Sequence, residues 1–242
     1  MAEMWQIIIV ALVSGLGGFI QRVTGFGFGI FVMLFFPLII EKHTAAAAVS
    51  TLISCGISAY NSVIYRKNIP YKKIIPPIVG ALVMIPLAVR FSVLISGDFF
   101  KKLLGLVLIL LSCYFLFFTN RIKIKPTLTN GVIAGGVGGI LTGLFSTGGP
   151  PIVLYLMNAL DNNAVYFAST QFYFGLTGLY STVVRLFNGI ITPEVLFYAV
   201  SGFIGCMAGN LIGKFVFSKL DGNKLKKIIY VFMIICGIIM IV

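Results

Sequence analysis

The sequence has 242 residues, of which 59% are hydrophobic and only 10% are charged, and its mean hydropathy is +1.08. A soluble domain carries roughly 25% charged residues, so the composition excludes a soluble enzyme, a disordered chain and a secreted disulfide scaffold. The net charge of +12 does not indicate nucleic-acid binding, because the basic residues fall between apolar segments and form no stripe with interleaved aromatic residues. We expect an all-α integral membrane protein.

Ten apolar segments follow one another along the chain, and six of them are long enough to cross a bilayer as helices. A hydrocarbon core of roughly 30 Å needs about 20 apolar residues at about 1.5 Å rise per residue. The six long segments are 44–65, 74–95, 103–119, 165–187, 195–217 and 225–242.

The other four segments form two adjacent pairs, 5–20 with 26–40 and 131–145 with 150–160. Each of the four is shorter than a full crossing, and each pair is joined by a glycine-rich stretch without a polar loop. This pattern predicts two re-entrant or broken helical hairpins whose tips lie inside the membrane. Such backbone is tolerated there only where it is buried in protein or lines a cavity.

The two halves of the chain resemble each other. The stretch GGFIQRVTGFGFGIFVML from Gly17 aligns with GGILTGLFSTGGPPIVLY from Gly138, at an offset of 121 residues. Further along, Arg66 aligns with Arg185 at nearly the same offset. We therefore expect one transmembrane domain over 1–242, built from a duplicated five-segment unit. Repeat 1 covers about 1–120, and repeat 2 covers about 126–242.

Charge predicts how the repeats are oriented. If each hairpin returns to the side on which it started, thirteen of the eighteen Lys and Arg residues lie on one side and five on the other. If each hairpin is one broken crossing, the split is nearly even. The first arrangement agrees with the excess of basic residues in cytoplasmic loops. It predicts two inverted repeats with both termini outside, an architecture of many secondary transporters.

The first hairpin tip has the chemistry of an anion site. Gly25 and Gly27 allow backbone N–H groups to turn toward a ligand, and Arg22 supplies a guanidinium that binds oxyanions through two parallel hydrogen bonds. Gln21 and Thr24 add neutral donors. Two alternatives remain open: the glycines could serve close helix packing, and Arg22 could extend to the interface.

The second tip is the counterpart of the first. Ser146, Thr147, Gly148 and Gly149 supply hydroxyl and backbone donors, and the two prolines that follow are suited to the first turn of a helix. A simple turn between helices is the alternative. We expect both tips to meet at mid-membrane and bind the substrate between them.

Polar residues inside the long segments face the bundle interior or a water-filled cavity. Gln171 is therefore a further candidate for substrate binding, although an interhelical hydrogen bond explains it equally well. Asn61, Thr170 and Arg185 are similarly placed. Arg185 lies near the end of its segment, so either a ligand role or a simple anchor at the interface is open for it.

The six acidic residues all fall in loops or at segment ends, so a proton pathway has few candidates. These are Glu41, the only histidine, His43, and Asp161, which matches Glu41 in the repeat. Cys55 and Cys206 lie in apolar runs, and none of the four cysteines forms a CxxC pair. No metal-binding, nucleotide-binding or hydrolase motif appears, so we expect no metal, no cofactor and no enzymatic activity.

With these residues on both tips, the sequence resembles the TauE/SafE family of sulfite exporters and related anion permeases. The motifs that carry the resemblance are GGFIQRVTGFGFGIF in the first half and GLFSTGGPPIVLYL in the second. The resemblance implies a bacterial or archaeal permease of the cytoplasmic membrane for sulfite, organosulfonates or related sulfur compounds.

The expected function is therefore secondary transport, most simply export, of a small sulfur-containing oxyanion by alternating access. The expected partners are this anion and the lipid bilayer, and a homodimer is left open. A passive anion channel, a thiol-dependent carrier that uses Cys55 or Cys206, and a structural subunit are the competing hypotheses.

Overall fold

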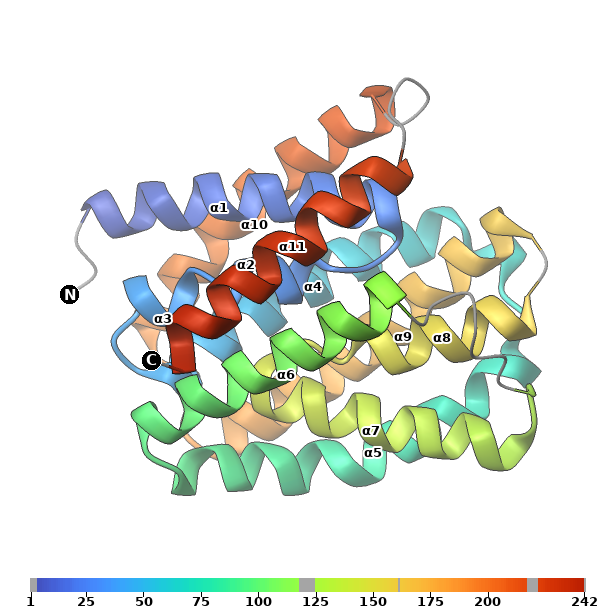
Figure 1. The fold of residues 1–242 in the computed structure, drawn as a ribbon, viewed down its shortest axis with the longest axis horizontal. Helices are drawn as coiled ribbons and strands as arrows, with labels where there is room; N and C mark the ends of the chain where they lie inside the picture. The colour runs from blue at the N-terminus through green and yellow to red at the C-terminus, as the bar shows by residue number, and fades with distance from the viewer. Residues whose placement is uncertain (1–3, 118–124, 161, 217–221, 242) are drawn as a thin grey trace.

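The computed structural model describes residues 4–117, 125–160, 162–216 and 222–241. Within these residues the chain is almost entirely helical and contains no β-strand (Figure 1). The prediction of an all-α protein is confirmed.

The order of long and short helices along the chain matches the predicted segments. The long helices are α1 (Met4–Thr24), α4 (His43–Ile64), α5 (Tyr71–Leu94), α6 (Gly97–Phe117), α7 (Leu128–Phe145), α9 (Asn163–Phe187), α10 (Pro193–Val216) and α11 (Gly222–Ile241). The short ones are α2 (Phe28–Val32), α3 (Phe36–Ile39), the 3₁₀ turn η1 (Arg66–Asn68) and α8 (Gly149–Ala159).

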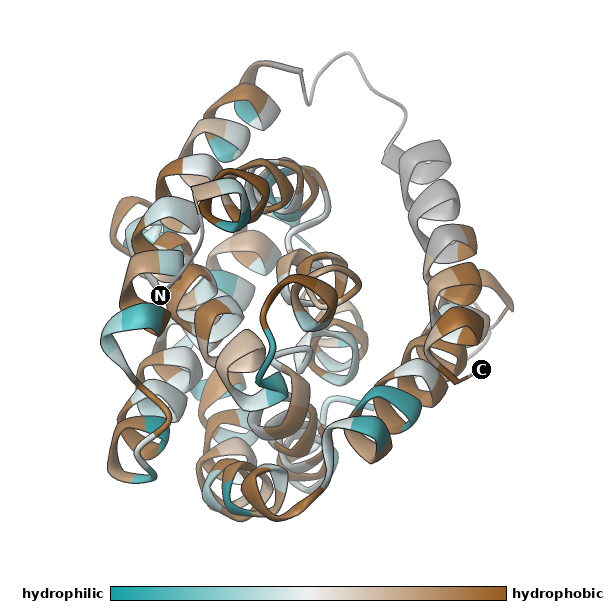
Figure 2. Cartoon of the chain, turned by 90° about the vertical axis from the view of Figure 1, so that its left-hand side faces the viewer, coloured by the Kyte–Doolittle hydropathy of each residue, from teal (hydrophilic) through white to brown (hydrophobic). Residues whose placement is uncertain are grey.

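Six helices of the described chain are long and apolar enough to cross a membrane: α1, α4, α5, α6, α7 and α10. Helix α9 has 25 residues but carries more polar side chains, several of them buried. Many large apolar side chains are exposed on the outside of the bundle, and hydrophobic colouring predominates over its helices in Figure 2. An exposed apolar surface of this extent on helices long enough to span a bilayer is that of a multi-pass membrane protein.

The prediction that both arms of each hairpin are short is wrong for the first arm. Helix α1 has 21 residues and α7 has 18. In α1 the helix extends past the predicted end because its last polar residues find partners: Gln21 bonds to neighbouring helices, and the Thr24 hydroxyl donates to the Ile20 carbonyl. Only the second arms are short, so each hairpin combines a long helix with one or two short ones.

The strongest helix contacts pair the two halves of the chain. Helix α1 packs along α10, α5 along α7, α4 along α9, and α6 along α11. Small residues bring the first two pairs into backbone contact. A Cβ on Gly209 would overlap the Gly15 carbonyl oxygen, and a Cβ on Gly135 would overlap that of Pro77. Both contacts are typical of helices that associate within a bilayer.

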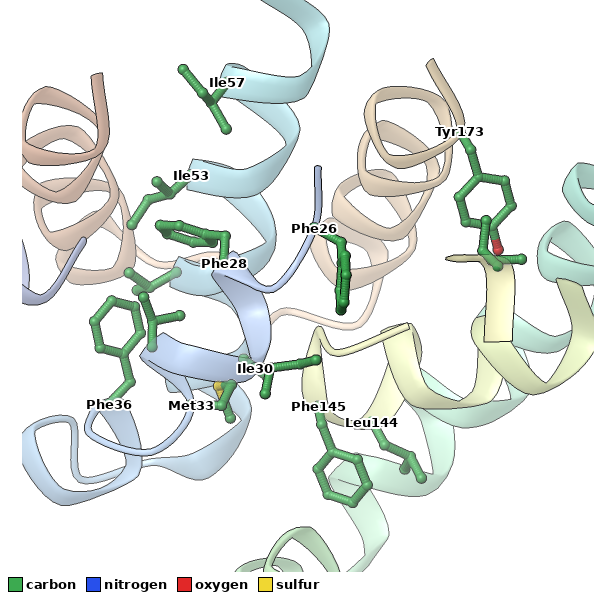
Figure 3. Close-up of a cluster of buried hydrophobic side chains, with 14 of the residues drawn as sticks. Phe26, Phe28, Ile30, Met33, Phe36, Ile53, Ile57, Leu144, Phe145 and Tyr173 are labelled. Carbon is green, nitrogen blue, oxygen red and sulfur yellow. The ribbon is translucent and has the colours of Figure 1, made fainter. Parts of the chain in front are cut away.

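A hydrophobic cluster surrounds the two tips and fixes their positions. Figure 3 shows Phe26 and Ile30 directed at the turn between α7 and α8, while Phe28 lies on the other side, beside Ile53 of α4. Phe28, Ile53 and Phe145 are almost fully buried. The tips are therefore enclosed by packed side chains at the centre of the bundle.

Candidate functional site

The two hairpin tips are in direct contact. A Cβ on Gly29, in the first turn of α2, would overlap the carbonyl oxygen of Ser146, which ends α7. Gly25 and Gly27 have φ angles of 81° and 97°, and Ser146 has 60°. These left-handed conformations let the chain reverse within a few residues. The predicted meeting of the tips is thus present, and it depends on glycine at position 29.

A cavity of about 40 Å³ lies where the tips meet. Helices α4 and α9 complete its wall. Three kinds of residue dominate the lining: hydroxyls (Thr51, Ser54, Thr142, Ser146, Thr147, Thr177), glycines (Gly27, Gly29, Gly148, Gly149, Gly178) and aromatics (Phe26, Phe28, Phe174), with Gln21 and Ile30 in addition.

The size and chemistry of the cavity restrict what it can hold. One water needs about 10–15 Å³ of such space, so 40 Å³ fits a few waters or an anion of a few atoms. No ionisable side chain is among the described residues that line it. The wall therefore offers neutral hydrogen-bond groups in an apolar surrounding.

Backbone N–H groups at both tips are available as donors. The first N–H groups of a helix have no partner within the helix, and α2 begins at this wall with Phe28, Gly29 and Ile30. In α8 the second and third residues are prolines, so Gly149 carries one of few remaining donors. The hydroxyl of Thr147 is buried and has no hydrogen-bond partner within the described chain.

Gln21 and Gln171 form the centre of a buried amide network. The Gln21 side-chain nitrogen donates to the Ser58 hydroxyl at 3.1 Å and to Gln171 Oε1 at 3.2 Å. Asn61 donates to the same Oε1 at 3.3 Å, and Gln171 donates to the Gly25 carbonyl at 3.0 Å. Gln171 is not among the residues that line the cavity, and its bonds hold both Gln21 and the first tip in place.

Arg22, the expected tip cation, lies in the last turn of α1 and is not among the cavity-lining residues. Its Nη2 donates to the Tyr65 hydroxyl at 3.1 Å, and its guanidinium carbon lies 5.1 Å from the Phe167 ring centre and 5.8 Å from that of Tyr65. The side chain is partly buried. The structure thus holds this cation between aromatic rings beside the first tip.

Thr24 and Gly25 form the turn that leads into the cavity wall without lining it. The Thr24 hydroxyl donates to the carbonyl of Ile20 and lies against that of Phe26. These contacts stabilise the end of α1 and the turn that follows it. Of the ten predicted substrate-binding residues, six line the cavity: Gln21, Gly27, Ser146, Thr147, Gly148 and Gly149.

Arg185 is completely buried in the last turn of α9. Its Nη2 donates to the carbonyls of Thr142 and Gly143 at 3.2 and 2.7 Å, in the last turn of α7. Nε and Nη1 have no hydrogen-bond partner in the part of the chain described. Since Thr142 lines the cavity, this guanidinium lies directly behind the wall.

From its position in the sequence, Arg185 is either a ligand or an interfacial anchor. Its full burial argues against an anchor whose charge reaches the membrane surface. The one sequence feature that singles out Arg185 is its alignment with Arg66 in the repeat. That alignment gives no indication of burial, because Arg66 itself is exposed in η1.

The predicted coupling residues lie away from the cavity wall where they are described. Glu41 is exposed, and His43 places its Nε2 3.0 Å from the Ser92 carbonyl with its ring against Phe100. Asp161 lies outside the described residues. Neither Glu41 nor His43 is among the residues that line the cavity.

Comparison with known proteins gives one match. A family model described as "Sulfite exporter TauE/SafE" matches residues 10–240, which is nearly the whole chain and includes both tips. No curated protein and no solved structure matches.

Proposed function

The chain belongs to the TauE/SafE family of sulfite exporters, and from this membership we propose that it exports sulfite or a related small sulfur oxyanion by alternating access. The substrate would bind in the cavity between the two tips. The membership supports an anion transporter and no enzymatic role.

The observation that carries this proposal is the contact between Gly29 and Ser146 around a cavity lined by hydroxyl and backbone groups. Backbone N–H groups suit an oxyanion because they donate without needing a counter-charge of their own. A volume near 40 Å³ matches a small oxyanion and excludes a bulky organic acid without rearrangement.

Arg185 would provide the positive charge that the cavity wall lacks. A buried guanidinium without a carboxylate partner is costly in an apolar interior, and an anion in the neighbouring cavity would offset this cost. Arg22, beside the first tip, would attract the anion toward the entrance from the side of η1. The two arginines would then lie beside the route of the anion without blocking it.

Alternating access needs two parts that can move against each other. We propose that these are inverted repeats, and two features support this. If each helix is replaced by its counterpart in the other half of the chain, the α1–α10 contact becomes the α7–α5 contact. The α4–α9 and α6–α11 contacts are unchanged by the same exchange. In addition, α1 and α7 run in opposite directions in Figure 1.

The coupling ion and the side of the termini stay predictions. Proton coupling would use Glu41, His43 and Asp161, and the excess of basic residues places the η1 end of the bundle in the cytoplasm. A thiol-dependent carrier that uses Cys206 has less support, because Cys206 is buried against Gly18 at the α1–α10 contact. Cys55 is half-buried, and its thiol lies 3.5 Å from the Gly175 carbonyl. A passive channel would give a flux that does not saturate.

A thermal-shift series in detergent tests the proposed substrate class. A ligand that binds only the folded state raises the melting temperature by mass action. We expect sulfite to raise the melting temperature of the purified protein while chloride leaves it unchanged. An equal or absent shift for every anion in a panel of sulfite, thiosulfate, sulfate, taurine, sulfoacetate and chloride would contradict the proposal.

A further inference from the structure

The amide network beside the cavity has one consistent assignment of donors and acceptors. The Gly25 carbonyl can only accept, so the group that bonds to it at 3.0 Å must be the Gln171 side-chain nitrogen. Gln171 Oε1 is therefore an acceptor. The amide groups that contact it must in turn present their nitrogens.

Two side chains meet this requirement. The Gln21 and Asn61 nitrogens lie 3.2 and 3.3 Å from Gln171 Oε1. Rotating either amide by 180° would place oxygen against oxygen, so the chemistry of the network fixes both orientations. The oxygens of Gln21 and Asn61 consequently point away from Gln171. Both are buried, and neither has a hydrogen-bond partner within the described residues.

Of these two acceptors, the one on Gln21 belongs to a residue of the cavity wall. A buried acceptor without a donor is destabilising, and such groups in native proteins are normally satisfied by a ligand, ion or water. Among the wall hydroxyls, those of Thr51 and Thr177 donate to carbonyls of their own helices, and none of the wall hydroxyls bonds to Gln21 Oε1. Since no donor of the described chain reaches Gln21 Oε1, a ligand or a water molecule in the cavity could supply one.

We propose that the transported anion carries its own hydrogen-bond donor and gives it to Gln21 Oε1. The class is a monovalent sulfur oxyanion with one O–H or N–H group, such as hydrogensulfite. Sulfate, a dianion without a proton, is disfavoured. This inference rests on the proposed function. The tip N–H groups bind the ionised oxygens, and Gln21 distinguishes the protonated anion from the unprotonated one.

Sulfamate and methanesulfonate test this directly. They have the same charge and similar shape, but sulfamate has an NH₂ group where methanesulfonate has a methyl group. By isothermal titration calorimetry on the purified full-length protein, we expect sulfamate to bind about tenfold more tightly, the difference that one satisfied buried acceptor makes.

Two variants locate the effect. Gln21→Met removes the acceptor and should bring the two affinities within about twofold of each other. Gln6→Met, near the start of the same helix, should keep the tenfold preference. Gln6 bonds to the Ile39 carbonyl and to Tyr198 and is not among the residues that line the cavity.

The possible outcomes separate the two proposals. Equal binding of sulfamate and methanesulfonate by the unmodified protein would overturn this inference, even if Gln21→Met fails to fold, and would leave the oxyanion site intact. Absence of binding by sulfamate, methanesulfonate and sulfite alike would overturn the proposed function itself.

Discussion

The carbonyl oxygen of Ser146 occupies the space that a Cβ on Gly29 would need. These residues belong to opposite halves of the chain, and their contact closes one side of the cavity. Any side chain at position 29 must push the two tips apart. The site and the fold thus depend on the same close approach of two backbone segments.

Replacing Gly29 with alanine should abolish sulfite transport in reconstituted vesicles, because separated tips no longer present their N–H groups to one anion. Overpacking at a tight contact costs about 1–3 kcal/mol, so the variant should still fold at a lower melting temperature. Gly136→Ala is the matched control, because a Cβ there comes only within 3.7 Å of a flexible Met84 side-chain atom. Normal transport by Gly29→Ala would contradict the site.

Arg185→Gln should weaken sulfite binding at least tenfold while the melting temperature stays equal or rises. The buried guanidinium has no carboxylate partner among the described residues, and the cost of such a buried charge is on the order of several kcal/mol. Removing it relieves that cost but also removes the counter-charge of the anion. Thermal unfolding with and without sulfite measures both effects. A large loss of stability with unchanged binding would assign Arg185 a purely structural role.

Arg22→Gln should raise the KM for sulfite severalfold and leave kcat nearly unchanged, because Arg22 lies beside the tip and not in the cavity wall. At low salt, Arg22→Lys should have a KM close to that of the unmodified protein, because the positive charge is kept. Uptake rates over a range of substrate and salt concentrations check this. If uptake by Arg22→Gln is unchanged, the residue has no part in transport and serves only to pack against Tyr65 and Phe167.

The two ends of the bundle should differ in accessibility. A cysteine introduced at exposed Lys67, after α4, should react with a membrane-impermeant maleimide only from the cytoplasmic side. One introduced at exposed Lys42, before α4, should react only from outside. Inverted vesicles and intact cells provide the two sides. Labelling of both positions from the same side would exclude the proposed crossing of α4.

The sequence predicted the helical class and the meeting of the tips well, because both follow from composition and from backbone requirements. An apolar content of 59% leaves few alternatives to a membrane bundle. Gly25 and Gly27 adopt positive φ angles, which is what a glycine-rich reversal requires.

The point at which α1 ends and the identity of the cation closest to the cavity were harder to predict. Where α1 stops depends on the partners of Gln21, and these come from α4 and α9. Arg22 looked like the tip cation because it is close to the glycines in sequence. In the structure it turns toward Tyr65, while Arg185, distant in sequence, reaches the back of the wall. Local motifs do not encode such long-range contacts.

Counterflow of radiolabelled sulfite in proteoliposomes tests the central claim most directly. If the site between the two tips is open to one side of the membrane at a time, unlabelled sulfite inside the vesicles should accelerate entry of labelled sulfite. The rate should saturate, and Gly29→Ala should abolish it. A flux that rises linearly with concentration and ignores the internal sulfite would contradict alternating access and identify the protein as a passive pathway.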